Sequence, residues 1–223
     1  MSYKIFILGP QGSGKGTQAK QLSVRLGIPT FSMGQLLRSE VAKQTEIGLK
    51  VKKTLEAGEL VPEEYANIML ERRIQKPDAK NGYVLDGFPR DLLQLRMLTA
   101  DYPTHVIVLE VPEKESIERL SHRLTCDRCG NVCNMSDGHK EGDRCDECNE
   151  GNLIRRSDDT PLATKKRLGI YKNETKPVIA EFEKKGIVLH VDGVGKIMDV
   201  HERIMKAFKL SHRGCDHLAL KKE

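Results

Sequence analysis

The chain has 223 residues, a length that suits one globular domain with inserted lobes and that is ample for a hydrophobic core. Charged residues make up 31% of the sequence and the apolar residues come in discrete runs, which argues against wholesale disorder. The formal net charge is +5, but basic and acidic residues are interleaved, so we expect no nucleic-acid partner. The N-terminal apolar run is too short for a signal peptide and no run could span a bilayer, so we expect a cytoplasmic protein with no membrane partner.

Short β-rich apolar runs alternate with helical patterns along most of the chain. The apolar runs predict strands at residues 3–8, 28–31, 83–85, 106–109 and 187–191. Helical periodicity predicts helices at roughly 15–26, 34–56, 63–76, 91–99, 113–123, 161–184 and 196–209. This alternation predicts an α/β fold in three layers, with a parallel sheet covered by helices on both faces. Pro177 should interrupt the long helical pattern that starts near Thr160 and divide it into two helices.

Two segments do not follow the alternation. Residues 32–61 continue with a helical pattern where a return strand would normally follow, and residues 124–160 are rich in Cys, Gly, Asp and Asn. We interpret both as lobes inserted into a core domain that consists of residues 1–31, 62–123 and 161–223. Residues 211–223 lack clear periodicity, which predicts a loose tail.

The first predicted strand leads into a glycine-rich motif. Residues 9–15 read Gly-x-x-x-x-Gly-Lys between a predicted strand and a predicted helix, which is the context of a phosphate-binding loop for ATP. Glycines let backbone N–H groups turn toward phosphate, and the helix N-terminus favours negative charge, while Lys15 would lie near the β- and γ-phosphates. Gly16 occupies the position of the usual hydroxyl residue, so the hydroxyl that would bind Mg²⁺ is displaced by one position, to Thr17.

Five of the six cysteines lie between Cys126 and Cys148. Four of them form two Cys-x₂-Cys pairs, which are Cys126 with Cys129 and Cys145 with Cys148. This spacing is typical of a four-cysteine Zn²⁺ site, and a disulfide framework is disfavoured in a reducing compartment. A closed tetrahedral site leaves no open coordination position, so we expect a structural metal that stabilises a small lobe with few apolar residues.

The sequence offers further candidate ligands and is compatible with more than one metal. Cys133 and His139 lie between the two pairs and could compete for the metal. The ligand type also allows iron in place of zinc. Cys215 stands apart from the cluster and is interpreted as an incidental free thiol.

Several motifs together resemble the adenylate kinase family. They are Gly14-Lys15-Gly16-Thr17, Asp86-Gly87-Phe88-Pro89-Arg90, Ser32–Arg38, Gly58–Pro62, Arg119 with Arg123, Arg156–Asp159 and Arg167, and they cover about residues 3–200. The resemblance implies a monomeric phosphate-loop nucleoside monophosphate kinase with an AMP-binding lobe at 32–61 and a lid at 124–160. It also implies the reaction ATP + AMP ⇌ 2 ADP with Mg²⁺, which balances adenine nucleotides. Many bacterial members similarly carry a metal knuckle in the lid.

The resemblance assigns residues to two nucleotide sites. The expected ATP site comprises Gly12, Ser13, Gly14, Lys15, Gly16, Thr17, Arg119, Arg123, Val132, Cys133 and Gly195. The expected AMP site comprises Met33, Arg38, Glu59, Leu60, Val61, Gly87, Phe88, Pro89, Arg90, Gln94, Arg156 and Arg167. The expected catalytic groups are Lys15, Asp86, Arg90, Arg123, Arg156 and Arg167.

These residue types suit the transfer of a phosphoryl group between two nucleotides. No covalent intermediate is needed, so catalysis consists mostly of positioning and of stabilising charge with fixed cationic donors. Asp86 ends a predicted strand at the crevice edge of the sheet, where it would hold Mg²⁺ through water or cap the following turn. The amide of Gln94 suits the edge of adenine. Met33 stands where many relatives have Thr, and this slightly weakens the assignment of AMP over other nucleoside monophosphates.

Two other functions fit parts of the sequence. A kinase for UMP or CMP is disfavoured by Gln94 and by the metal knuckle in the lid. A zinc-ribbon nucleic-acid-binding module fused to an NTPase is disfavoured because the ribbon lacks exposed aromatics and a basic stripe. The flanking Arg123 and Arg156 instead fit a lid that closes on ATP. We therefore expect residues 32–61 and 124–160 to move on ligand binding and to exclude water.

Overall fold

The structure, a computed structural model, describes residues 2–98 and 102–208. Its central sheet has five strands in the order β2-β3-β1-β4-β8, all paired in parallel. The strands are β1 (Tyr3–Leu8), β2 (Thr30–Ser32), β3 (Gly82–Asp86), β4 (His105–Glu110) and β8 (Val188–Asp192). The α/β fold predicted from the sequence is therefore confirmed, and each predicted strand is present within one or two residues at either end.

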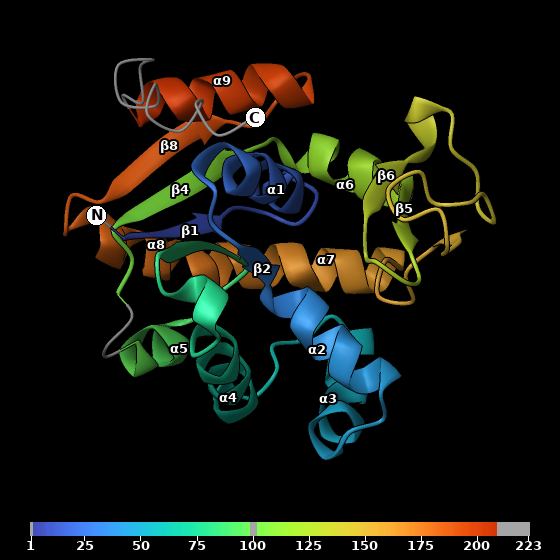
Figure 1. Cartoon of the computed structure of the whole chain (residues 1–223), viewed down its shortest axis with the longest axis horizontal. Coiled ribbons are helices and arrows are strands. Elements are labelled where there is room, and N and C mark those ends of the chain that lie inside the picture. Colours follow the sequence, from blue (N-terminus) through green and yellow to red (C-terminus); the bar gives the residue numbers. More distant parts are fainter. Residues whose placement is uncertain (1, 99–101, 209–223) are drawn as a thin grey trace, which may run out of the picture.

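Helices cover both faces of this sheet because alternate side chains of its buried strands point to opposite sides. Ile5 and Ile7 pack on the face covered by α1 (Lys15–Leu26) and α9 (Ile197–Ala207). Phe6 packs on the other face, which is covered in part by α8 (Lys176–Glu183). Figure 1 shows α1 and α9 on one side of the sheet and α8 on the other. The remaining α-helices of the described ranges are α2 (Met33–Ala42), α3 (Glu46–Glu56), α4 (Glu63–Ile74), α5 (Leu92–Met97), α6 (Glu113–Ser121) and α7 (Pro161–Ile170).

The prediction of one helical stretch over residues 34–56 is wrong, because α2 and α3 are separate helices that pack against each other. Gln44 has a φ of 53° in the connecting turn, and the side chain of Thr45 caps α3 by accepting from the backbone N–H of Gly48. A Cβ atom at Gly48 would lie only 2.1 Å from the carbonyl oxygen of Glu40. Glycine is therefore required where these two helices approach each other.

The prediction of two helices in this region is confirmed by α7 and α8, but they are divided by a π-helical turn before Pro177 and not by a break at the proline. A π-helical turn, Tyr171–Thr175, connects α7 directly to α8, and the backbone N–H of Lys176 donates to the carbonyl of Tyr171. Proline has no N–H to donate to the preceding turn. The π-helical turn just before Pro177 changes the hydrogen-bond register and lets the helix proceed without that donor.

Residues 123–154 contain a second, three-stranded antiparallel sheet in the order β6-β5-β7. Its strands are β5 (Arg123–Cys126), β6 (Val132–Asn134) and β7 (Leu153–Ile154). Leu124 and Leu153 are fully buried in its small core beside the cysteine cluster. Figure 1 shows this unit to one side of the central sheet, beyond α6 and α7.

Two further sequence expectations concern the C-terminal tail and membrane-spanning segments. The predicted tail at residues 211–223 lies outside the described residues. Across residues 2–98 and 102–208, each helix is too short or too polar to cross a membrane.

Candidate active site and metal site

The phosphate loop follows β1 and ends where α1 begins at Lys15. Gly9, Gly12 and Gly14 have φ values of 145°, 81° and 87°, a region that favours glycine. A Cβ at Gly9 would lie 2.5 Å from the carbonyl oxygen of Leu109, and one at Gly12 would lie 2.6 Å from that of Ser116. The glycines are therefore needed both for the curved backbone and for the close approach of the loop to β4 and α6.

Lys15 is buried beneath this loop. Its ammonium group donates a hydrogen bond of 2.7 Å to the carbonyl of Pro10. Burial lowers the pKa of Lys15 to about 8, and the carboxylate of Asp86 partly opposes this shift. At neutral pH the lysine is therefore mainly charged, and a bound polyphosphate would raise its pKa back toward the ordinary value.

Asp86, at the end of β3, faces the start of α1. One of its carboxylate oxygens, Oδ2, lies 3.6 Å from the position that a Cβ at Gly16 would take. The other oxygen, Oδ1, is buried and has no hydrogen-bond partner in the described part of the chain. A buried acceptor without a donor is costly. This position therefore suits a hydrated cation.

Three arginines from different segments converge on Asp158, which is only 4% exposed. Arg156 donates to it through Nε at 2.8 Å, Arg167 forms an ion pair with it, and Arg38 of α2 lies 3.7 Å away. Burial by itself raises the pKa of Asp158. The hydrogen bond from Arg156 and the charges of these arginines outweigh burial, and hold the pKa of Asp158 well below its usual range.

Two arginines also converge on the neighbouring Asp159. Arg123 donates to its carboxylate through Nε at 2.7 Å, and Arg167 donates through a terminal nitrogen at 3.2 Å. Sequence reasoning placed Asp158 and Asp159 in the family motif but gave neither a role. The adjacency of two acids to Arg156 was the available signal, because buried guanidinium groups need counter-charges.

Two clefts open beside the arginines. The first is lined by Leu8, Gly9, Gln11, Lys15, Gly58, Gly87, Arg90, Arg167, Ile170, Tyr171 and Thr175. The second is lined by Met33, Gly34, Leu37, Arg38, Leu55, Gly58, Glu59, Leu60, Val61, Ala66, Gly87, Arg90, Gln94 and Arg167. The two clefts share Gly58, Gly87, Arg90 and Arg167, so they meet at two arginine side chains.

The second cleft gathers most of the residues that the sequence assigned to AMP. Phe88 is an exception, because its ring is 1% exposed and packs in the core, and it is joined to Pro89 by a cis peptide bond. Neither Pro89 nor Arg156 lines the second cleft. Gln94 does line it, and the oxygen of its side-chain amide already accepts a hydrogen bond from the backbone N–H of Arg90 at 2.9 Å.

Some residues assigned to ATP lie apart from both clefts. Arg119 donates to the carbonyl of Gly193 at 3.2 Å, in the loop between β8 and α9 that also contains Gly195. Val132 and Cys133 lie on β6 and line neither cleft. The structure thus places these four residues on α6, on the loop between β8 and α9 and on β6. Of the residues assigned to ATP, Lys15 is the one that lines a cleft.

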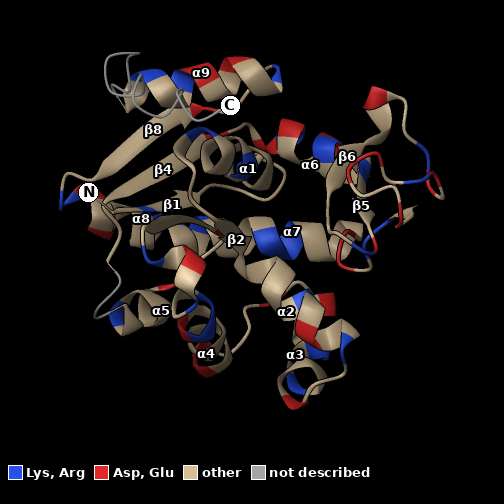
Figure 2. Ribbon diagram, in the orientation of Figure 1, with Lys and Arg blue, Asp and Glu red and all other residues tan. Residues whose placement is uncertain are grey.

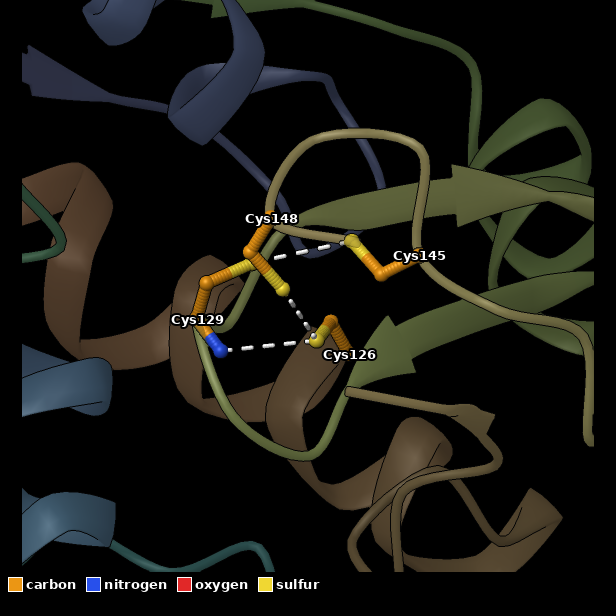
Figure 3. Close-up of side chains that lie close together, drawn as sticks. All are labelled: Cys126, Cys129, Cys145 and Cys148. Atoms are coloured by element: carbon orange, nitrogen blue, oxygen red, sulfur yellow. Dashed lines mark hydrogen bonds between the residues drawn. The ribbon is translucent and has the colours of Figure 1, made fainter. Parts of the chain in front are cut away.

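The four predicted cysteines form a compact cluster, drawn in Figure 3. The sulfur of Cys126 lies 3.7 Å from that of Cys148, and the sulfur of Cys129 lies 3.7 Å from that of Cys145. A tetrahedral site with Zn–S bonds of about 2.3 Å requires sulfur atoms about 3.8 Å apart. Backbone hydrogen bonds from Glu150 and Gly151 lower the pKa of Cys148 to about 7, whereas burial raises the pKa of Cys129 to about 12. A bound metal would lower the pKa of both thiols, because it binds them as thiolates.

Neither of the competing ligands joins this cluster. In the described ranges the group of potential ligands within 4.8 Å of one another consists of the four cysteines. Cys133 pairs in register with Leu124 across the small sheet, and His139 lies 3.9 Å from Asp146. The arrangement therefore matches the two-pair prediction and can hold a metal ion.

If the metal is structural, its removal should lower the stability of the protein more than it lowers the activity. Chelation of the full chain should lower its Tm by about 10 °C, because metal binding at such a site contributes directly to folding. Cys145→Ser should lose the bound metal, whereas Cys133→Ser should keep one ion per chain by elemental analysis. Loss of activity from a metal-free protein with an unchanged Tm would contradict a purely structural metal.

The parallel sheet carries a phosphate loop after its first strand, and a second cleft meets the cleft of this loop at two arginines. These features define a phosphate-loop protein of the nucleoside monophosphate kinase fold. The profile of the family described as adenylate kinase matches residues 7–187. The chain is 41% identical over 209 residues to the adenylate kinase of Kosmotoga olearia, covering 91% of this chain and 97% of that protein. It is 42% identical over 207 residues to that of Archaeoglobus fulgidus, covering 90% and 95% respectively. The chain belongs to the adenylate kinase family.

Proposed function

We propose that this protein catalyses the reversible transfer of a phosphoryl group from ATP to AMP, giving two ADP, and so balances and salvages adenine nucleotides. The observation that carries this proposal is the meeting of two clefts at Arg90 and Arg167. One cleft contains Lys15 of the phosphate loop, and the other contains the residues assigned to a monophosphate. Two nucleotides bound in these clefts would direct their phosphates toward the same pair of guanidinium groups.

The site residues take complementary roles in this proposal. Lys15 would hold the β- and γ-phosphates of ATP, while Arg38 and Arg90 would hold the phosphate of AMP. Arg167, with Arg123 and Arg156 from the lid side, would stabilise the charge of the transferring phosphoryl group. The counter-charges of Asp158 and Asp159 keep these arginines oriented before phosphates arrive.

Two metals have distinct roles in the proposal. When bound with ATP, Mg²⁺ would neutralise charge on the phosphate oxygens. The unpartnered oxygen of Asp86 fits this ion through a water, and Thr17 offers a hydroxyl one position beyond the usual one. The cysteine cluster would hold a structural Zn²⁺.

We also propose that residues 32–61 form an AMP-binding lobe and residues 124–160 a zinc-binding lid, both closing on the core of residues 1–31, 62–123 and 161–223. Contacts across these segments support closure. Gln35 of α2 donates to the carbonyl of Cys129 at 3.0 Å, and Lys166 of α7 forms an ion pair with Glu59. Closure would exclude water and so protect ATP from hydrolysis. We further propose a monomer that works in the reducing cytoplasm, where the cysteines stay available for metal.

The test compares monophosphate acceptors under one set of conditions. Full-length protein with MgATP should form ADP with AMP far faster than with UMP or CMP, and should not bind DNA or RNA tightly at physiological salt. A preference for UMP or CMP would favour a pyrimidine nucleotide kinase. Tight nucleic-acid binding without consumption of AMP would favour a zinc-ribbon module fused to an NTPase.

A further inference from the structure

The backbone of Arg90 is held on both sides by buried side chains. Its N–H donates to the amide oxygen of Gln94 at 2.9 Å, and its carbonyl accepts from the hydroxyl of Thr175 at 2.8 Å. Its side chain is then turned back, because Nε donates to the carbonyl of Gly87 at 2.9 Å. Three hydrogen bonds therefore fix the point from which the Arg90 guanidinium reaches the junction of the two clefts.

Thr175 is the most distant of these partners in sequence. It lies 85 positions from Arg90, is only 6% exposed, and lines the first cleft. It is also the last residue of the π-helical turn that follows α7. The same continuous helix therefore carries Arg167, which lines both clefts, and the hydroxyl that holds Arg90 (Figure 2 shows the basic residues of α7).

The π-helical turn sets the direction of the Thr175 side chain. Each residue of an α-helix advances the side-chain direction by about 100°, so a change of register by one residue would rotate Thr175 by about that angle. The N–H of Lys176 donates five residues back, to the carbonyl of Tyr171, and Pro177 provides no competing N–H donor. The local sequence thus supports an irregular turn, and such turns are frequent at functional sites.

We infer that Thr175 is a positioning residue, which acts through Arg90 to fix its guanidinium where the two clefts meet. This inference rests on the proposed function, since its consequence is the correct placement of the monophosphate of AMP against ATP. Arg90 needs such support because burial and the charge of Arg167 oppose its own charge and lower its pKa. Without the hydroxyl, the carbonyl of Arg90 loses its buried donor and the segment Gly87–Arg90 can shift.

The test uses variants that separate the hydroxyl from the packing of the side chain. Thr175→Val keeps the β-branched shape and removes the hydroxyl, whereas Thr175→Ser keeps the hydroxyl. We expect Thr175→Val to lower kcat/KM for AMP by about 10–100-fold, because small misplacements of this kind have effects of that size. Thr175→Ser should stay within about threefold of wild type, and the Kd for ATP should change little in both. Thr175→Ala provides a second variant without the hydroxyl, in case the valine variant does not fold.

A readout that needs no turnover separates this inference from the proposed function. The Nε–H signal of Arg90 in nuclear magnetic resonance spectra should be sharp in wild type and in Thr175→Ser, and broadened or shifted in the variants without the hydroxyl. If wild type formed no ADP while these spectra behaved as expected, the proposed function would fail and the positioning role would stand. Equal kcat/KM values for AMP in wild type and the variants without the hydroxyl, or a loss in Thr175→Ser as large as in Thr175→Val, would overturn the inference.

Discussion

Replacing Arg167 by alanine is expected to lower kcat by about 10²–10³-fold, the effect of removing one preorganised donor from a transition-state site. Arg167 is 7% exposed, lines both clefts and pairs with both Asp158 and Asp159. In the proposed reaction it would therefore contact the group that passes between the nucleotides. Steady-state kinetics with ATP and AMP varied separately should show most of the loss in kcat and less in either KM.

The matched control is Arg72→Ala. Arg72 lies exposed on α4 and lines neither cleft. Its replacement by alanine removes the same type of side chain, but from the surface. This control should retain kcat within about twofold, as surface substitutions usually do. Similar losses in the two variants, or a change in KM alone for Arg167→Ala, would argue that Arg167 does not act on the transferring group.

Asp158→Asn is expected to destabilise the nucleotide-free protein by about 3–5 kcal/mol, because it leaves buried guanidinium groups without their counter-charge. For a chain of this length that loss corresponds to a Tm lower by roughly 10 °C. In the proposed site, a bound inhibitor that joins two nucleotides would supply phosphates to the same arginines. The inhibitor should therefore raise the Tm of Asp158→Asn more than that of wild type, as scanning calorimetry can measure.

The pH dependence gives a second check on Asp158. Its folded-state pKa is depressed, so its contribution to stability is fully present above its unfolded pKa of about 3.9 and is lost as pH falls toward the folded value. The difference in unfolding free energy between wild type and Asp158→Asn should be constant above about pH 5 and shrink below about pH 4. A difference that grew on acidification would contradict a charge-balancing role.

Local motifs made the phosphate loop and the metal site predictable from the sequence. The loop needs glycines at fixed spacings for backbone reasons, and Gly9, Gly12 and Gly14 have positive φ values in the structure. Two Cys-x₂-Cys pairs direct their thiolates to one point whatever their surroundings. The spacing alone did not exclude Cys133 as a ligand, whereas the structure shows that Cys133 is not in the cluster. The order of strands and helices was likewise readable, because buried parallel strands are continuous apolar runs.

Contacts between distant segments were not predictable in the same way. The turn between α2 and α3 depends on Gly48 meeting Glu40, and continuous helix through Pro177 depends on a π-helical turn. The bond between Thr175 and Arg90 joins residues whose types and local contexts give no signal of it. The sequence supplied the arginines and placed two acids beside Arg156, whereas the pairing of Asp159 with the distant Arg123 depends on packing.

The stoichiometry of product formation tests the central claim most directly. Full-length wild-type protein with MgATP and AMP, followed by phosphorus nuclear magnetic resonance, should convert one ATP and one AMP into two ADP without releasing inorganic phosphate. Omission of AMP should stop consumption of ATP, because the proposed closure would exclude water as an acceptor. Hydrolysis of ATP at the same rate with or without AMP, or unchanged AMP in the presence of ATP, would contradict a site in which two nucleotides meet at Arg90 and Arg167.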